Sequence, residues 1–397
     1  MKNWAGNLTY GASEWHIPDS LYELQKLVAK TPKIRAIGTR HSFNRVADTD
    51  GALVSLERFQ GMELNTFTHT VTVGAGVRYG ELGQYLHEQG YALHNLASLP
   101  HINVVGAVTT ATHGSGDKNG NLATIVRSFE RVNAAGELEQ ISGEALEAQL
   151  VSLGQLGIVT SITLAVEPTY EVTQDVYEGL SLETLKAEFD AVTSSAYSVS
   201  VFTDWVSGQG ALWCKRRTLS PVSEVSFGTT RAEGLRHPLP DVDPVSCTEQ
   251  LGVSGAWHLR LPHFKLEFTP SFGEELQSEF FVPRERAAEA LAAIQALSNQ
   301  IAPLLFISEL RTVAADNLWL SPQYQRDSLG IHFTWKPDWP AVSAVLPAIE
   351  AALAPFHARP HWGKLFLTPS QHPKLADFIT LRHELDPEGK FANAFLV

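Results

Sequence analysis

A single histidine, His41, stands where a short apolar segment ends and a loop opened by glycine begins. The stretch AIGTRHSFNRVADTDG runs from residue 36 to residue 51, and the apolar segment ends at Gly38. A neutral imidazole can act as a nucleophile, a base or a ligand. Most lone loop histidines, however, lie at the surface or bond the turn, and a glycine after a strand commonly marks only a turn. By itself, the stretch leaves a structural and a chemical interpretation open.

A second glycine-bearing stretch, ASLPHINVVGAVTTATHGSG, runs from residue 97 to residue 116. Its glycines, Gly106, Gly114 and Gly116, stand among small and hydroxyl-bearing residues. Such a segment lets backbone N–H groups approach a phosphate or a flat ring closely. It matches neither the Walker A pattern nor GxGxxG, so on its own it is a weak indication of a nucleotide site.

Two predicted strands in the C-terminal half each place polar or charged residues two positions apart. Side chains alternate along a strand, so Glu309 and Arg311 share one face of FISELRTV. In the same way, His332 and Thr334 share one face of GIHFTW. Such a face either meets water or binds the hydroxyl groups of a sugar-like ligand. Lys364 follows a glycine in RPHWGK, where a lysine is commonly a solvated loop charge.

Helix and strand patterns indicate the elements that position these residues. Apolar residues at helical spacing predict helices over 19–30, 78–90, 181–196, 283–302 and 341–356. Ser20 and Glu23 have the spacing of a capping box at the start of the first helix. Strands are predicted over 33–38, 52–56, 70–76, 157–168, 198–205, 211–217, 304–313 and 329–335, and a hairpin over 125–142. Strands and helices mix without repeating βαβ units, which predicts an α+β fold rather than a doubly wound one.

The length of the chain and a change in its sequence pattern predict two domains. The 397 residues exceed one typical core, and the pattern changes after about Tyr170. Residues 218–262 form a long irregular stretch rich in proline, glycine and polar residues, and loops of that length are usually functional or mobile.

Charge and cysteine content exclude several classes of function. The chain carries 43 acidic and 30 basic residues, a net charge of −13, and shows no basic patch, so no nucleic-acid partner is expected. The same charge disfavours an anionic substrate or membrane and favours a neutral polar substrate. Cys214 and Cys247 fit neither a metal site nor a disulfide framework. With no secretory segment and no apolar run near bilayer length, we expect a cytoplasmic protein without a membrane partner or a metal.

Many short motifs, in order along nearly the whole chain, resemble those of one family. They are NWAGNLTY, GTRHSFN, VGAGVRYGEL, NLASLPHI, THGSG, YSVSVFTDW, CTEQ, ELRTVAAD, HFTW, RPHWGK and LDPEGKFANAF. As a set they resemble the alditol oxidase and xylitol oxidase group of the vanillyl-alcohol-oxidase family of FAD-linked oxidases. The HWGK motif and the C-terminal motif also resemble the related sugar-lactone oxidases.

The resemblance implies a fold and a cofactor site. It implies an FAD-binding domain of two α+β subdomains over residues 1–170, with residues 367–397 packing back on it, and a sheet-based α+β substrate domain over 171–366. It implies that FAD is attached covalently through His41. Many relatives have glycine in place of Arg40, which either pairs with a phosphate or points to water. The other implied FAD contacts are Ala36, Ile37, Gly38, Thr39, Ser42, Ser98, Asn103, Gly106, Thr110, Ala111, Thr112, His113 and Ile158.

The resemblance also implies a reaction. It implies an oxidase that converts the terminal primary alcohol of alditols such as xylitol or sorbitol to the aldose and reduces dioxygen to hydrogen peroxide. The implied substrate contacts are Ser98, Glu309, Arg311, Thr334 and Lys364. Among them, Arg311 and Lys364 would stabilise negative charge on the reacting oxygen, and Lys364 or His332 would assist removal of the proton.

Two alternative functions stay open. A sugar-lactone oxidase or dehydrogenase of the gulonolactone or galactonolactone type would share the flavin site but take a cyclic substrate. A carbohydrate-binding protein without flavin would belong to another class. The expected partners are a small polyol and dioxygen, and the expected state is a monomer.

Overall fold

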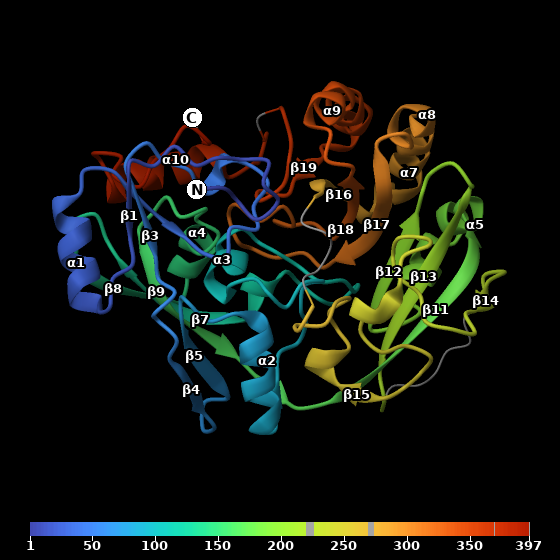
Figure 1. Ribbon diagram of the computed structural model, residues 1–397, viewed down its shortest axis with the longest axis horizontal. Coiled ribbons are helices and arrows are strands. Elements are labelled where there is room, and N and C mark those ends of the chain that lie inside the picture. Colours follow the sequence, from blue (N-terminus) through green and yellow to red (C-terminus); the bar gives the residue numbers. More distant parts are fainter. Residues whose placement is uncertain (220–225, 269–273, 369, 397) are drawn as a thin grey trace.

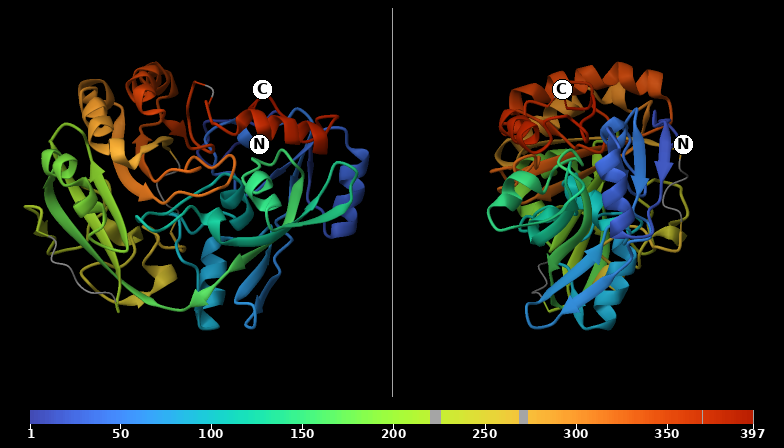
Figure 2. Two further views of the ribbon diagram at one scale, coloured as in Figure 1. Left: turned by 180° about the vertical axis from the view of Figure 1, so that it is seen from behind. Right: turned by 90° about the vertical axis from the view of Figure 1, so that its left-hand side faces the viewer.

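The computed structural model describes residues 1–219, 226–268, 274–368 and 370–396 (Figure 1). The N-terminal elements and helix α10 (Leu375–Leu385) form one half of the molecule, on the left in Figure 1. The strands from residue 171 onward form the other half, on the right. Both ends of the chain lie on the left-hand half, and Figure 2 shows the same division from behind. Helices and sheets thus combine in an α+β fold, as the sequence predicts.

A small parallel sheet carries the segment that leads to His41. Its order is β1 (Glu14–His16), β3 (Ala52–Ser55), β2 (Ile34–Ile37). Helix α1 (Leu21–Lys30) packs its apolar side into the same core. Half of the predicted capping box is confirmed, because the Ser20 hydroxyl accepts a hydrogen bond from the Glu23 N–H at 3.3 Å. The Glu23 carboxylate accepts instead from the Asp19 N–H, at 2.8 Å.

An antiparallel sheet forms the second layer of this half. Its order is β4 (Met62–Asn65), β5 (Thr70–Gly74), β9 (Ile158–Ala165), β7 (Val126–Val132), β8 (Leu138–Ser142). The predicted hairpin is confirmed as β7 and β8, with Gly136 at φ +84° in its turn. Helices α2 (Tyr79–Glu88), α3 (Val104–Thr109) and α4 (Ala145–Gln149) accompany this sheet, and the short strands β6 (Tyr91–Ala92) and β10 (Glu167–Pro168) pair with each other.

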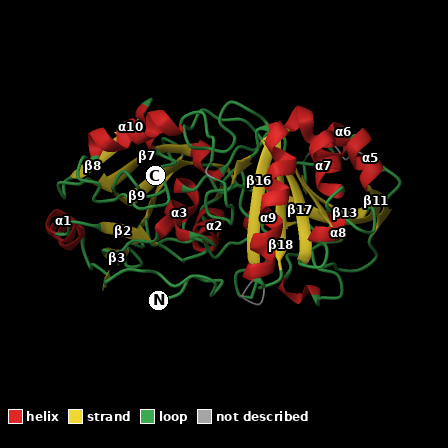
Figure 3. Cartoon of the chain, turned by 90° about the horizontal axis from the view of Figure 1, so that it is seen from above, coloured by secondary structure: helices red, strands yellow, loops and turns green. Residues whose placement is uncertain are grey.

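A nine-stranded sheet dominates the other half. Its order is β14 (Thr230–Arg231), β11 (Glu171–Ser181), β13 (Gln209–Arg217), β12 (Ser198–Thr203), β17 (Leu305–Val313), β18 (Ser328–Trp335), β16 (Leu276–Pro283), β19 (Arg359–Pro360), and β15 (Gly255–Ala256) also pairs with β11. Helices α5 (Leu182–Ala187), α6 (Phe189–Thr193), α7 (Ala287–Gln295), α8 (Ser298–Ile301) and α9 (Trp339–Leu353) lie in this half, and α9 lies over β16 and β18 (Figure 3). The domain boundaries at residues 170 and 366 remain predictions.

Two predicted helices are shorter than the sequence indicates. The helix expected over 181–196 is divided at Glu188, which has non-helical backbone angles, and the helix expected over 283–302 is divided into α7 and α8. Helix α9 continues through Pro347, whose ring is exposed. Apolar residues on both sides of each division pack into the core of the nine-stranded sheet, so tertiary packing overrides local propensity at these positions.

Among the described residues, one helical segment, Trp339–Phe356, is long enough and apolar enough in composition to cross a membrane, whereas the sequence predicts no such segment. Only a third of this segment is buried, but its apolar side joins the core of the nine-stranded sheet. The buried side chains of α9 are Val342, Val345, Leu346, Ile349 and Leu353. An amphipathic core helix accounts for this composition.

Candidate active site

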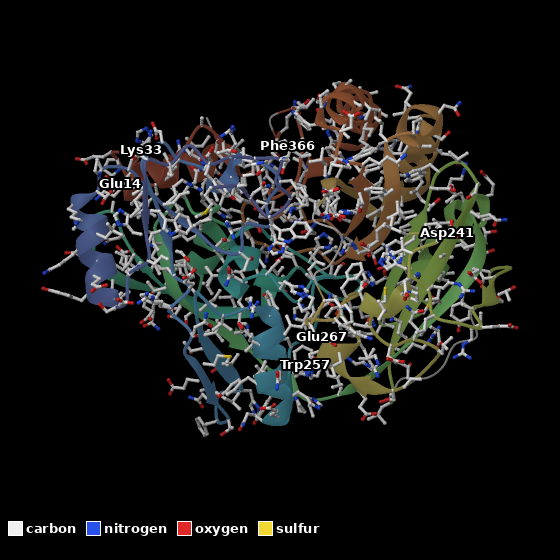
Figure 4. All side chains as sticks on the ribbon, viewed as in Figure 1. Glu14, Lys33, Asp241, Trp257, Glu267 and Phe366 are labelled. Carbon is white, nitrogen blue, oxygen red and sulfur yellow. The ribbon has the colours of Figure 1, made fainter. Side chains whose placement is uncertain are left out.

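A cavity of about 1110 Å³ lies between the two halves of the molecule. Its lining comes from the loop after β2, the segment 97–113, strands β17 and β18, residues 237–246 and residues 361–364. Figure 4 shows the described side chains of the whole molecule, and two of the residues that it labels, Glu267 and Trp257, lie near the junction of the two halves without lining the cavity. This volume exceeds that of most drug-sized ligand sites, so it can hold a large cofactor together with a small substrate.

Bare backbone lines the cavity at two glycines. A Cβ added to Gly38 would lie 2.6 Å from Oδ1 of Asn103, so only glycine lets the loop after β2 approach this side chain. Asn103 in turn donates from Nδ2 to the Gly76 carbonyl at 2.7 Å. At Gly106, a Cβ would meet nothing nearer than 4.0 Å, which leaves open space beside the backbone. This half of the cavity suits a flat or phosphate-bearing group that lies close to the main chain.

His41 presents an imidazole with free nitrogens. Among the described residues, neither buried ring nitrogen has a hydrogen-bond partner of normal geometry. The Trp4 indole stacks on the imidazole, with ring centroids 5.0 Å apart and planes at 20°. Burial lowers the pKa of His41 to about 4; His101 adds to the shift and a backbone group of Thr39 opposes it. The ring is therefore neutral near pH 7 and keeps a lone pair, which fits a residue that bonds to a cofactor.

Arg40 belongs to the cavity lining and is exposed. Its backbone is left-handed, at φ +64°, and its guanidinium donates to the Lys2 carbonyl at 3.4 Å. Both predicted roles of Arg40, pairing with a phosphate and pointing to water, remain predictions.

The polar wall of the cavity is a row across four strands. The residues Phe202, Glu309, His332 and Glu279 stand directly opposite one another on β12, β17, β18 and β16. Directly paired residues project to the same side of a sheet. The predicted faces are confirmed: Glu309, Arg311, His332 and Thr334 line the cavity, whereas Leu310, Ile331 and Phe333 lie in the apolar core.

Glu279 lies behind this wall, outside the cavity lining, and contacts three charged or ionisable residues that line it. Its side chain is fully buried, and Lys364 Nζ donates to its Oε2 at 2.5 Å. Arg311 donates to Oε1 at 2.9 Å, and His113 Nε2 lies 3.2 Å from the same oxygen. Lys364 and Arg311 outweigh burial and hold the pKa of Glu279 well below its usual range. A buried carboxylate with these partners stays ionised and fixes the positions of two cations.

Lys364 is not a solvated loop charge. Its side chain is 14% exposed, and it donates to His332 Nδ1 at 2.6 Å as well as to Glu279. Burial lowers the pKa of Lys364, while Glu279 opposes the shift. His332 Nε2 lies 3.1 Å from the Thr334 hydroxyl. His332 therefore accepts at Nδ1 and donates at Nε2, and burial together with Lys364 lowers its pKa to about 4.

A second buried chain of groups supports Glu309. His263 Nε2 lies 2.8 Å from Glu309 Oε1, and Lys215 Nζ lies 3.2 Å from His263 Nδ1. Arg311 Nε is 3.5 Å from the same Glu309 oxygen and its Nη1 donates to the Ser98 hydroxyl at 3.2 Å. Burial lowers the pKa of Lys215 to about 7, and Glu309 opposes the shift. Glu309 is thus held in one orientation at the cavity wall.

Three buried ligand-type residues, His113, Glu279 and His361, place donor atoms within 4.8 Å of one another. Both Glu279 oxygens already receive hydrogen bonds from cations, Lys364 and Arg311. Two fixed positive charges beside the carboxylate disfavour a metal cation at this position.

The structure brings together nearly all of the predicted site residues. Ala111 and Ile158 are the exceptions: both are buried in apolar clusters and do not line the cavity. The predicted residues that line it are Ala36, Ile37, Gly38, Thr39, Arg40, His41, Ser42, Ser98, Asn103, Gly106, Thr110, Thr112, His113, Glu309, Arg311, His332, Thr334 and Lys364.

Sequence reasoning missed several residues at or behind the cavity wall, namely Trp4, Lys215, His263, Glu279 and His361. Glu279 left one usable signal, because it is the single charged residue of the strand LQSEFFVP and precedes a run of apolar residues. A charge in the middle of a buried strand needs a partner, and that need points to a site.

Several known proteins and protein families are similar to this chain in sequence or in fold. Residues 16–142 match the FAD binding domain family, and residues 268–397 match the D-arabinono-1,4-lactone oxidase family. Alditol oxidase of Streptomyces sp. (strain IKD472 / FERM P-14339) is 46% identical, over 100% of this chain and 98% of its own. L-gulono-1,4-lactone dehydrogenase of Mycobacterium tuberculosis is 25% identical, over 99% and 97%. The solved glucooligosaccharide oxidase of Acremonium strictum has a TM-score of 0.75 at 15% identity, over 100% and 94%.

Proposed function

The chain belongs to the alditol oxidase group of the FAD-linked oxidases, and from this premise we propose that it oxidises the terminal primary alcohol of alditols such as xylitol and sorbitol to the aldose. Dioxygen is the electron acceptor and hydrogen peroxide the second product. One observation carries the proposal: a single cavity joins the free imidazole of His41 to a sheet face that carries Glu309, Arg311 and Lys364. We also propose that the protein is a cytoplasmic monomer.

FAD fits the half of the cavity that contains His41. Its attachment to a nitrogen of His41 would use the free lone pair of a neutral imidazole. The backbone around Gly38 and Gly106 would hold the rest of the cofactor. A histidyl-linked FAD is the subject of the solved glucooligosaccharide oxidase, which has the same fold. When bound, FAD supplies the two-electron acceptor for the alcohol and passes the electrons to dioxygen.

The other half of the cavity fits an open polyol. Each substrate hydroxyl both donates and accepts, and the wall offers both kinds of partner. Glu309 accepts, Arg311 donates, and Ser98 and Thr334 can do either. These groups are held by partners of their own, so the binding face is formed before substrate arrives.

Lys364 is the proposed acid–base group. As the alcohol is oxidised, negative charge develops on its oxygen, which Arg311 and Lys364 stabilise. The neutral amine of Lys364 can accept the hydroxyl proton of the substrate, and burial favours this form because it lowers the pKa of Lys364. The ammonium group that results donates to His332 Nδ1, which lies 2.6 Å from Lys364 Nζ, and to Glu279.

A sugar-lactone oxidase or dehydrogenase is the second candidate, because residues 268–397 match the D-arabinono-1,4-lactone oxidase family. Peroxide release should be measured with xylitol, sorbitol, 1-pentanol and L-gulono-1,4-lactone, with a dye as acceptor in a parallel series. We expect kcat/KM for xylitol to exceed that for 1-pentanol by at least about 100-fold, because each unpaired buried group costs about 1–3 kcal/mol. Faster turnover of the lactone than of either alditol would contradict the proposal.

An absorption spectrum tests the flavin itself. We expect a yellow protein whose colour stays in the pellet after acid precipitation. A colourless protein would support the carbohydrate-binding alternative, which the match of residues 16–142 to the FAD binding domain family disfavours.

A further inference from the structure

The first ten residues fold into a small closed loop against the segment that carries His41. Lys2 pairs with Thr9 in an isolated antiparallel bridge. Asn3 closes the loop, because its N–H donates to the Leu8 carbonyl and its Oδ1 accepts from the Leu8 N–H, both at 3.0 Å. Asn3 is 4% exposed. These hydrogen bonds fix the conformation of the N-terminal loop.

Hydrogen bonds join this N-terminal loop to the backbone on both sides of His41. The Trp4 N–H donates to the Arg40 carbonyl at 2.9 Å, immediately before His41. Asn3 Nδ2 donates to the Ser42 carbonyl at 3.0 Å, immediately after it. The main chain of the loop after β2, which we call the flavin loop, is thus held at Arg40 and Ser42, the two residues that flank His41.

Trp4 also holds the ring of His41. The indole and the imidazole stack at 5.0 Å with an interplanar angle of 20°, and this is the one ring contact of His41 among the described residues. Neither nitrogen of the imidazole has a hydrogen-bond partner of normal geometry among the described residues, and the contact with the Thr39 backbone is the one polar interaction that acts directly on the ring there. The stack with Trp4 therefore orients the imidazole ring, a role that a hydrogen bond to one ring nitrogen usually has.

We propose that Trp4 is a positioning residue that holds the His41 ring in the orientation required for covalent attachment of the flavin. The inference rests on the proposed function, because it requires FAD in the cavity. Both Trp4 and His41 line that cavity. Fixing one partner in a reactive orientation converts a rare encounter into a frequent one, so loss of the stack slows attachment without removing the nucleophile.

Covalent attachment of the flavin is a two-electron oxidation, and dioxygen, the oxidant of the proposed reaction, accepts the two electrons. One bond forms between a nitrogen of His41 and the 8α carbon of the flavin, and one C–H bond on that carbon breaks. The two electrons of the C–H bond pass to the ring system and then to dioxygen. The proton from the carbon and the proton from the imidazole N–H complete hydrogen peroxide.

The test compares Trp4→Ala, Trp4→Phe and Trp339→Ala with the wild type. Attachment is irreversible, so cells are sampled at several times after induction, and each purified holoprotein is precipitated with acid. The covalent fraction is the flavin in the pellet divided by the total flavin. Trp339 is a matched control, because it is a half-exposed tryptophan on α9, outside the cavity lining.

Covalent flavin should accumulate at least about fivefold more slowly in Trp4→Ala, with total bound flavin within about twofold of the wild type. Trp4→Phe keeps an aromatic face and should restore most of the rate, and Trp339→Ala should match the wild type. A covalent fraction in Trp4→Ala that rises as fast as in the wild type would overturn the proposal. If Trp4→Ala does not fold, Trp4→Phe and a Trp4→Leu variant decide: equal rates in both overturn the role of stacking.

The same measurement separates this proposal from the proposed function. A wild type whose flavin is released entirely by acid contradicts covalent attachment, and the role of Trp4 is overturned with it. A wild type with covalent flavin, together with Trp4→Ala at the wild-type rate, contradicts the role of Trp4 alone.

Discussion

Lys364 lies between a carboxylate and an imidazole, so its charge and its proton are both engaged before substrate binds. Lys364→Met keeps most of the stem and removes the charge. Because the charge on the substrate oxygen develops only during the reaction, the variant should fold and bind flavin but reduce it at least about 100-fold more slowly with xylitol. Anaerobic stopped-flow absorbance measures this step apart from oxygen. Bleaching within about threefold of the wild-type rate would assign proton removal to another group.

Substitution of Glu279 tests whether its carboxylate holds the cationic side chains of Lys364 and Arg311 in position. Glu279→Gln keeps the size of the side chain and removes the charge that raises the pKa of Lys364. Without it, the pKa of Lys364 falls further, so the pH profile of flavin reduction should move to lower pH and the rate should fall by about 10-fold or more. Asp316→Asn is a matched control, because Asp316 is half-buried outside the cavity lining and bonded to Ser321. An unshifted profile in Glu279→Gln would reject this role.

At the residue scale, alternation along a strand made part of the site predictable. Glu309 and Arg311 could be placed on one face because a strand leaves each side chain only two directions. Glu279 could not be placed with them, because its partners Lys364 and His113 come from segments far away in the sequence. Resemblance correctly indicated most cavity residues, but motif position alone cannot tell a cavity-lining residue from a buried neighbour.

At the scale of elements, the junction between β2 and α3 depends on Gly38. A Cβ in Gly38→Ala would lie 2.6 Å from Asn103 Oδ1, and Asn103 is already bonded to Gly76. Either the Asn103 side chain loses its bond to Gly76 or the two elements separate, and we expect the flavin content per protein to fall by at least about half. Gly61→Ala is the control, because a Cβ there meets nothing within 4 Å. Equal flavin-to-protein absorbance ratios in the two variants would contradict this packing argument.

Element type was predictable where local and tertiary preferences agree. The capped helix before β2 and the hairpin β7–β8 both occur, because capping and turn chemistry are local. The division at Glu188 depends instead on how two helices meet the nine-stranded sheet, which no local pattern contains. The N-terminal loop escaped prediction for the same reason: its contacts with the flavin loop join residues nearly forty positions apart.

At the scale of the whole molecule, buried histidines make the fold sensitive to mild acid. Burial lowers the pKa of His263 and His332 to about 4 and that of His372 to about 3. An unfolded histidine has a pKa of about 6.5, so the unfolded chain binds more protons between these values. Stability from these groups is complete above about pH 6.5 and is lost as pH falls toward 4.

Two effects of pH oppose each other, and their sizes decide the outcome. The net charge of −13 becomes smaller on acidification, which relieves repulsion, but salt at physiological strength screens that repulsion beyond about 8 Å. Each buried histidine instead contributes about 1 kcal/mol per pH unit near pH 5.5. The histidines should dominate, and the apparent Tm should fall by about 5 °C or more between about pH 7 and about pH 5.

Thermal scans followed by circular dichroism at constant ionic strength measure this dependence. His372 supplies an internal comparison, because it lies outside the cavity lining and Nε2 bonds the Ser321 carbonyl at 2.7 Å. His372→Asn removes one of the titrating groups, so its Tm should depend less steeply on pH than that of the wild type, whatever its absolute stability. A wild-type Tm that is constant or rises from about pH 7 to about pH 5 would mean that relief of charge repulsion outweighs the buried imidazoles.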